Sequence, residues 1–158
     1  MIVTEKKALK DIIKDFKNKG KNVLIKRGVF DIIHPGHIYA IKTFKKHCDI
    51  LIILIMSDEL VQIKKGDKRP INSQEHRMKV SDGLSRVDYV YPDSSRSREE
   101  YIELLYYLKP SIVAVTKGDT KKTKMYSSKL WTLKEFSDVP GYSTTEIIEK
   151  ISDRSLLD

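Results

Sequence analysis

Short apolar segments alternate with amphipathic segments along most of this chain. Five apolar runs have the length of buried strands: 22–27, 49–56, 87–91, 111–115 and 130–136. Apolar residues recur at three- and four-residue spacing in five further segments, which predicts helices: 4–19, 36–47, 73–84, 98–108 and 143–151. Strands that alternate with helices favour a parallel sheet. We therefore expect an α/β fold with about five parallel strands and helices on both faces.

Turn and cap residues refine the ends of these segments. Thr4 is the expected N-cap of the first helix. Pro92 is expected to end the third strand, because proline cannot donate to a sheet. The basic stretch 116–124 is expected to be a loop, followed by a short helix near 126–129.

The length and the absence of long apolar runs restrict the class of protein. A chain of 158 residues fits one domain, so we expect a single domain at 1–158, with its core at 22–151 and residues 1–20 as an accessory helix. The run Ile50 to Met56 is too short to cross a bilayer, and the N-terminus lacks the apolar region of a signal peptide. Cys48 is the only cysteine, so no disulfide can form within the chain and a cytoplasmic location is expected. We do not expect the chain to bind a membrane.

The formal net charge of +8 has two interpretations. A basic protein can bind nucleic acid by neutralising its phosphates. It can equally be an enzyme whose substrates are anionic phosphates. The basic residues are scattered along the chain and no nucleic-acid motif is present, so the second interpretation is favoured.

The segment 28–37, Gly-Val-Phe-Asp-Ile-Ile-His-Pro-Gly-His, joins the first strand to the second helix. It places His34 and His37 where the helix begins. Unpaired backbone N–H groups and the positive end of the helix dipole make such a turn a natural seat for phosphate. Pro35 suits the first helical turn, and Gly36 lets a ligand approach the backbone. Two ordinary loop histidines are the alternative, but the strand-to-helix context favours a nucleotide site.

This segment resembles the H-x-G-H signature of the cytidylyltransferase-like nucleotidyltransferases. The resemblance implies a Rossmann-like sheet, and it implies that His34 and His37 contact a triphosphate and stabilise charge during nucleotidyl transfer. It also implies that further residues of the segment bind the nucleotide: Gly28, Val29, Phe30, Asp31 and Gly36.

A second motif covers residues 65–78. It resembles the adenylyltransferase domain of bacterial ADP-heptose synthases more closely than glycerol-3-phosphate cytidylyltransferase. Lys65 is expected to be catalytic, as a mobile point charge, and Arg77 to grip two phosphate oxygens. The alternative is a solvated basic loop followed by an arginine on a helix surface. For Lys68 and Arg69, a solvated position in the loop is at least as well supported as a role in binding.

A third motif, Lys117-Gly118-Asp119, follows the fourth strand. It resembles the Lys-Gly-Gly-Asp of the heptose enzymes with one glycine missing. Gly118 is expected to lie near a base or ribose, and Asp119 to accept a hydrogen bond from a ribose hydroxyl. A simple turn is the alternative.

The fourth motif, Tyr142-Ser143-Thr144-Thr145, precedes the last helix. Ser143 is expected to cap that helix, with Glu146 at the third helical position. The family carries the same Ser-Thr-Thr, whose hydroxyls and amides bind the triphosphate. One helix terminus can serve both purposes.

The resemblance extends from about residue 23 to residue 151, with four motifs in the family's order. Two departures leave the choice of base and acceptor open. Lys26-Arg27 replaces the small polar pair that usually precedes the glycine, which puts charge beside the pocket. Tyr142 stands where the family usually has a smaller residue.

The resemblance implies transfer of a nucleoside monophosphate, AMP favoured over CMP, from ATP or CTP to a small phosphorylated substrate. A sugar phosphate such as heptose 1-phosphate is favoured, and pyrophosphate leaves. Glycerol-3-phosphate cytidylyl transfer and FAD synthetase-type adenylyl transfer are alternatives, and so is a non-catalytic module that binds nucleotide or nucleic acid. Mg²⁺ is expected to be carried by the triphosphate, without protein ligands of its own, and the chain is expected to form a homodimer.

Overall fold

The computed structural model describes residues 1–118 and 120–154. Five strands form one sheet: β1 (Val23–Gly28), β2 (Ile50–Met56), β3 (Tyr89–Asp93), β4 (Ile112–Thr116) and β5 (Thr132–Phe136). Seven helices are described with them: α1 (Lys6–Asn18), α2 (Pro35–Lys45), α3 (Asp58–Lys65), α4 (Gln74–Asp82), α5 (Arg98–Leu108), α6 (Thr120–Tyr126) and α7 (Thr144–Arg154).

All neighbouring strands of the sheet run parallel, in the order β3-β2-β1-β4-β5. The chain winds outward from β1 in one direction, then returns to the other side of β1 and winds outward again. The carboxyl ends of β1 and β4 therefore flank a topological switch point, where open α/β sheets bind their ligands. The Rossmann-like parallel sheet of about five strands is confirmed.

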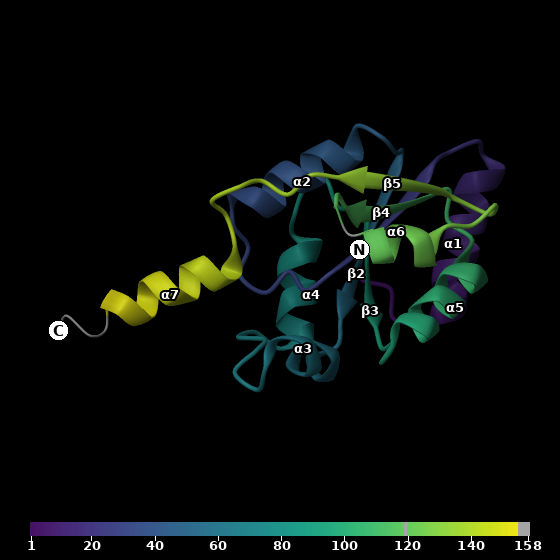
Figure 1. The fold of residues 1–158 in the computed structure, drawn as a ribbon. Helices are drawn as coiled ribbons and strands as arrows, with labels where there is room; N and C mark the ends of the chain where they lie inside the picture. Colours follow the sequence, from purple (N-terminus) through teal and green to yellow (C-terminus); the bar gives the residue numbers. More distant parts are fainter. Residues whose placement is uncertain (119, 155–158) are drawn as a thin grey trace.

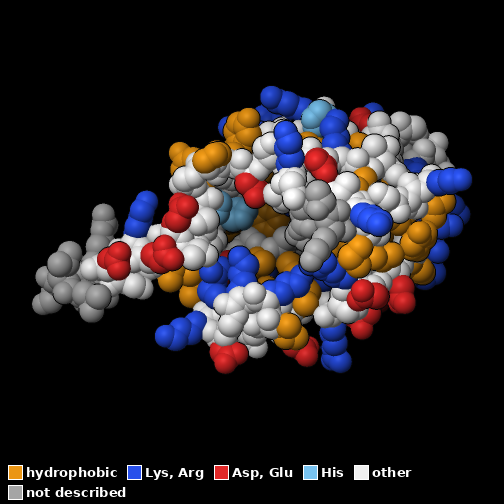
Figure 2. Space-filling model, in the orientation of Figure 1, with side chains coloured by type: hydrophobic (Ala, Val, Ile, Leu, Met, Phe, Trp, Pro, Cys, Tyr) orange, Lys and Arg blue, Asp and Glu red, His pale blue; other side chains and the backbone are white. Residues whose placement is uncertain are grey.

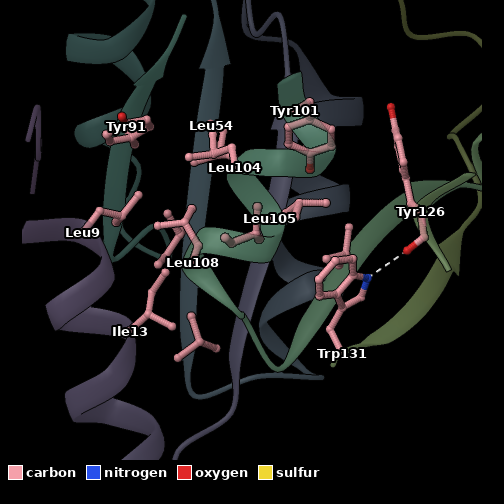
Figure 3. Close-up of a cluster of buried hydrophobic side chains, with 14 of the residues drawn as sticks. Leu9, Ile13, Leu54, Tyr91, Tyr101, Leu104, Leu105, Leu108, Tyr126 and Trp131 are labelled. Atoms are coloured by element: carbon pink, nitrogen blue, oxygen red, sulfur yellow. Dashed lines mark hydrogen bonds between the residues drawn. The ribbon is translucent and has the colours of Figure 1, made fainter. Parts of the chain in front are cut away.

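Helices lie on both faces of the sheet (Figure 1). Two layers of apolar side chains, one on each face, hold them there. Successive strand residues point to opposite faces, so each strand contributes to both layers. Under α1 and α5 the first layer includes Leu9, Ile13, Tyr101 and Leu105, and near α6 the Trp131 indole donates to the carbonyl oxygen of Tyr126 at 2.8 Å (Figure 3). The second layer lies under α2 and α4 and includes Phe44, Ile53 and Met78.

Two helices stand apart from these layers. α3 lies at the carboxyl end of the sheet, where Leu60 and Val61 pack with Met56. α7 projects away from the rest of the molecule and is drawn in yellow in Figure 1. Within the described residues, no helix combines the length and the apolar character that a bilayer crossing requires.

The first helix begins later than expected. Its N-cap is Glu5, which makes no side-chain capping bond, so the prediction of Thr4 was wrong. The preceding residues form a bridge beside β3, in which the amide of Val3 donates to the carbonyl oxygen of Val90 at 2.9 Å. This pairing keeps the chain extended up to the start of the helix.

Two other boundaries differ from the prediction for identifiable reasons. β3 continues through Pro92 to Asp93. Because β3 is the edge strand of the described sheet, a proline can stay in it without interrupting a pairing on its outer side. α6 lies in the stretch 116–124 that was expected to be mainly loop, and the helix expected near 126–129 is absent. Lysine favours helix, and burial of Tyr126 anchors the end of α6.

Candidate active site

A cavity of about 580 Å³ opens at the carboxyl end of β1. Its walls come from the loop that follows β1, the first turn of α2, and the segment 137–146 that leads into α7. Figure 2 shows this hollow, with histidine on its wall and lysine and arginine along its lower rim. The cavity lies beside the switch point of the sheet, where ligands bind in this architecture.

The two imidazole rings of the 28–37 segment lie against each other in the cavity wall. His34 occupies the N-cap position of α2 and His37 lies in its first turn, with ring centroids 3.9 Å apart. The Phe30 ring also packs near His37, at 5.0 Å between ring centroids. The rings therefore support one another in a fixed arrangement at the helix N-terminus.

Two glycines make this arrangement possible. A Cβ on Gly28 would lie 2.6 Å from the Phe30 ring, because Phe30 folds back over the glycine with a φ of 51°. A Cβ on Gly36 would lie 3.0 Å from both the Nδ1 atom of His34 and the Cβ atom of Tyr142. These positions are glycine because a side chain would displace the residues that shape the cavity.

Burial disfavours the protonated form of both imidazoles. Desolvation, reinforced by the neighbouring His34, lowers the pKa of His37 to about 4. The pKa of His34 is also lowered by burial, and the carboxylate of Glu146 partly opposes this change. The Nδ1 atom of each ring is buried and has no hydrogen-bond partner in the part of the chain described. An unsatisfied buried nitrogen costs about 1–3 kcal/mol, so such a pair is suited to meeting a polar ligand.

The N-terminus of α7 forms another part of the cavity wall. Ser143 caps this helix as predicted, since its Oγ atom accepts from the amide of Glu146 at 3.1 Å. The Oγ1 atom of Thr144 donates to the carbonyl oxygen of Ile32 at 3.5 Å, which ties the start of α7 to the histidine loop. The structure thus brings Tyr142, Ser143, Thr144 and Thr145 to the same cavity as the histidines.

Lys65 lies at the end of α3 and contributes to the cavity rim. Its ammonium group makes no hydrogen bond or ion pair with the described residues. Gly66 follows with a φ of 90°, which ends the helix and turns the chain away. Lys65 is therefore placed as a mobile cation on the wall of the cavity that the two imidazoles also line.

Asp31 lines the cavity, but its carboxylate is occupied by the chain 69–72. It accepts hydrogen bonds from the amides of Ile71 at 2.9 Å and Asn72 at 2.8 Å, and it pairs with Arg69 at 3.0 Å. Arg69 is therefore not part of a solvated loop, as one alternative had it. We interpret Asp31 as a positioning residue that fixes the chain before α4 against the histidine loop.

Arg77 does not line the cavity, so the expectation that it grips phosphate needs correction. Its side chain is fully buried, at 0% exposure, and the alternative of a helix-surface arginine is equally wrong. The guanidinium donates to the carbonyl oxygens of Val29, Met56 and Asn72 and to the carboxylate of Asp58, at 2.5–3.0 Å. Arg77 thus ties together the ends of β1 and β2 and the chain before α4.

The first two residues of the third motif are not among those that line this cavity. Lys117 and Gly118 are exposed and do not line it, although the preceding Thr116 does. The amide of Lys117 donates to the carbonyl oxygen of Phe136 at 2.8 Å, and Gly118 has a φ of 87°, as in a turn. The structure thus favours the turn interpretation for this pair. Asp119 lies outside the described residues.

Comparison with known families decides which family this chain belongs to. The family model described as "Cytidylyltransferase-like" matches residues 25–150, which include the histidine loop and the start of α7. The chain belongs to the cytidylyltransferase-like family. Membership makes it a nucleotidyltransferase, so this prediction from the sequence is confirmed.

Relatives of this cytidylyltransferase-like chain cover nearly all of it. The Bifunctional protein HldE of Haemophilus influenzae (strain PittEE) is 38% identical over 149 residues, which are 90% of this chain and 30% of that protein. The Bifunctional protein HldE of Marinomonas sp. (strain MWYL1) is 36% identical over 94% of this chain and 31% of its own length. The chain thus spans less than a third of the curated relatives that it matches.

Solved structures share the fold of this cytidylyltransferase-like chain. A lipopolysaccharide core biosynthesis protein from Thermoplasma volcanium GSS1 has a TM-score of 0.62 and 25% identity, over 76% of this chain and 99% of its own. A pantoate-beta-alanine ligase from Francisella tularensis has a TM-score of 0.59 at 15% identity, over 97% of this chain and 78% of its own. The second likeness concerns the fold alone.

Sequence reasoning missed part of this family member's cavity. Phe136 and Asp138 line it but belong to no motif that was singled out for binding, and Glu146 was expected only as part of the cap of α7. Their place at and after the carboxyl end of β5 was the available signal, since ligands gather at that edge. The described residues contain no group of three histidines, cysteines or carboxylates that is arranged to hold a metal ion.

Proposed function

We propose that this chain transfers a nucleoside monophosphate, AMP favoured, from a triphosphate to the phosphate of a small phosphorylated sugar, with release of pyrophosphate. One observation carries the proposal: two neutral imidazoles and the N-terminus of α7 line the same cavity. Both elements donate hydrogen bonds to anions, and together they surround a space suited to a polyphosphate.

The proposed reaction needs no strong general base. An oxygen of the acceptor phosphate, already anionic, forms a bond to the α-phosphorus, and the bond from that phosphorus to the bridging oxygen of the β-phosphate breaks. The electron pair leaves with pyrophosphate. His34 and His37 donate N–H groups to the phosphate oxygens as charge builds, and the first-turn amides of α7 do the same. Lys65 neutralises charge at the rim.

Mg²⁺ enters this proposal as part of the triphosphate substrate. The carboxylates that line the cavity come from Asp31, Asp138 and Glu146. Asp31 is occupied by Arg69 and two amides, and the described residues hold no group of three histidines, cysteines or carboxylates placed to bind a metal ion. Such a donor set suits an ion held mainly by phosphates and water.

The preference for AMP and for a sugar phosphate such as heptose 1-phosphate rests on similarity. The motif at 65–78 resembles the adenylyltransferase domain of ADP-heptose synthases, and HldE proteins are 34–38% identical to this chain. CMP transfer to glycerol 3-phosphate and AMP transfer to flavin mononucleotide are the alternatives that the test below includes. A cytoplasmic location, where triphosphates are made, belongs to the same proposal.

We also propose that the chain acts as a homodimer. A groove of about 660 Å³ runs along the outer side of α2, where its apolar lining includes Ile33, Ile38, Tyr39 and Tyr142. Both tyrosine side chains are exposed, and Ile151 on the projecting α7 is exposed as well. A second copy that covers this groove would bury these apolar groups. Sedimentation of the purified protein tests the oligomeric state.

Release of pyrophosphate tests the reaction. The purified chain is mixed with ATP, CTP, GTP or UTP and Mg²⁺, and with heptose 1-phosphate, glycerol 3-phosphate or flavin mononucleotide. We expect pyrophosphate above background with ATP and heptose 1-phosphate. Release with another pair would correct the substrate. Absence of release with every pair, together with salt-dependent binding of random duplex DNA, would support the non-catalytic module instead.

A further inference from the structure

A second cavity, of about 220 Å³, adjoins the first at the carboxyl end of the sheet. Phe44 and Phe136 bring the α2 layer of the core to the first cavity, whereas Tyr101, Val115 and Tyr126 bring the α5 layer to the second. Ala114 of the α2 layer also lines the second cavity, so the two cavities share the strand ends and differ mainly in which layer lines them. We infer that the second cavity holds the carbon skeleton of the acceptor and that Arg27 determines which acceptor binds. This inference rests on the proposed function.

Arg27 occupies a built position between the two cavities, both of which it lines. Its Nε atom forms an ion pair with the Oδ2 atom of Asp93, and the two side chains are only 8% and 0% exposed. An Nη2 hydrogen is donated to the carbonyl oxygen of Ser95 at 3.2 Å. The guanidinium carbon lies 4.4 Å from the centre of the Tyr101 ring. Arg27 is thus held on three sides.

The ion pair determines what Arg27 can recognise. Asp93 also accepts from the amide of Ser95 at 3.0 Å and from its hydroxyl at 2.6 Å, which holds the carboxylate in place. The pair is neutral overall, but a guanidinium has five N–H groups and the contacts to Asp93 and Ser95 use only some of them. Its role is therefore to donate hydrogen bonds to neutral oxygens such as sugar hydroxyls, rather than to supply net charge for a phosphate.

Lysines line the second cavity as well. Lys64 and Lys65 come from the end of α3, and Lys65 lines both cavities. Its ammonium group makes no hydrogen bond or ion pair with the residues that the structure describes. An acceptor with its phosphate at Lys65 would place that phosphate at the junction, beside the triphosphate site. Its carbon atoms would then lie against Tyr101 and Tyr126.

The size of the second cavity favours a small acceptor. Pockets for drug-sized ligands measure about 300–1,000 Å³, so 220 Å³ suits a smaller molecule. An apolar, aromatic wall with a few fixed polar groups matches a phosphorylated sugar or polyol. The isoalloxazine ring system of flavin mononucleotide is larger than a sugar or polyol and is the least suited of the three acceptors to this space. The acceptor is thus inferred to be a small polyhydroxylated monophosphate.

Binding without turnover tests this inference. Calorimetry of the full chain, saturated with α,β-methylene-ATP and Mg²⁺, measures the affinity of heptose 1-phosphate, glycerol 3-phosphate and flavin mononucleotide. The test variant combines Arg27→Gln with Asp93→Asn, which removes the guanidinium without leaving a buried charge unpaired. Val115→Phe, which narrows the second cavity alone, is the independent variant. Arg86→Gln, at an exposed position, is the matched control.

We expect heptose 1-phosphate or glycerol 3-phosphate to bind the unaltered chain and flavin mononucleotide not to bind. Both test variants should weaken acceptor binding about tenfold or more, with less than about a twofold change for the nucleotide analogue, as in the control. Equal acceptor affinity in the chain and both variants would overturn the inference. Binding of the analogue but of neither small phosphate would also overturn it and leave the nucleotide site standing. Failure to bind the analogue would overturn the proposed function itself.

Discussion

Two groups of polar residues meet at the carboxyl end of the sheet and differ in how far their hydrogen bonds are satisfied. Asp31 and Arg77 are saturated by partners from the surrounding chain. The Nδ1 atoms of His34 and His37 are buried without a partner among the described residues, and Lys65 is likewise unengaged there. All of these residues were expected to bind the nucleotide from the sequence, and the structure gives them different roles.

The difference separates residues that build the site from residues that bind. A saturated buried group contributes to the free energy of folding and has little left for a ligand. An unsatisfied buried donor costs free energy until a ligand arrives, so it contributes to binding and not to folding. Substitutions in the two groups should therefore affect different measurements.

Among these substitutions, Arg77→Ala should have the largest effect, which is a loss of stability. Removal of the guanidinium leaves three carbonyl oxygens and the Asp58 carboxylate without their donor. We expect the free energy of unfolding to fall by about 3–5 kcal/mol, measured by urea denaturation. Lys79→Ala, which breaks an exposed pair with Glu75 on the same helix, should leave it nearly unchanged. Unchanged stability in Arg77→Ala, with loss of activity only, would restore this residue to the binding group.

His37→Ala should show the opposite behaviour. Loss of one donor to the developing charge is worth about 3 kcal/mol, so kcat for pyrophosphate release should fall about a hundredfold or more. The loss of stability should be smaller than in Arg77→Ala, since the Nδ1 atom of His37 has no partner in the described chain to lose. Turnover close to that of the unaltered chain would refute the mechanism.

Ser143→Ala tests the residue that belongs to both groups. Loss of the cap of α7 should cost about 1 kcal/mol of stability and also raise KM for the triphosphate, because the capped turn faces the cavity. Ser97→Ala removes an equivalent cap from α5, which does not line this cavity. The control should lose similar stability with no change in KM. Equal KM values in both variants would make Ser143 a structural cap only.

The smallest expected effect is the pH dependence of stability. An unfolded histidine titrates near pH 6.5, whereas burial lowers the pKa of folded His37 to about 4. Between these values the unfolded state binds more protons, so the contribution of His37 to stability is complete above about pH 6.5 and declines as the pH falls toward 4. Urea denaturation measures the free energy of unfolding at pH 7 and at pH 5. We expect this free energy to decline less between the two pH values in His37→Asn than in the unaltered chain. An ordinary titration of His37 in the folded protein, followed by NMR, would contradict this.

The sequence could predict those parts of the site whose residues are neighbours in the chain and lie at a recognisable strand or helix end. The histidines, Gly28 and Gly36 lie within ten consecutive residues, where a strand-to-helix junction already defines their surroundings. Ser143 was predictable as a cap for the same local reason. The alternation of apolar runs was enough to predict the parallel sheet, because burial on both faces demands such runs.

The roles of Asp31 and Arg77 depended on contacts that no local pattern contains. Asp31 pairs with residues 38–41 positions later, and Arg77 donates to the carbonyl oxygen of Val29, 48 positions earlier. A basic side chain at the start of a helix looks the same in sequence whether it faces solvent, phosphate or the core. Folding decides between these, because a buried guanidinium must find partners for its donors.

The central claim is that the imidazole pair and the start of α7 bind one polyphosphate. NMR titration with α,β-methylene-ATP and Mg²⁺ tests it most directly, through the ring protons of His34 and His37 and the amide protons of Ser143, Thr144 and Thr145. We predict that both sets of resonances shift together and give a single Kd. Shifts confined to one set, or two unrelated Kd values, would contradict the claim.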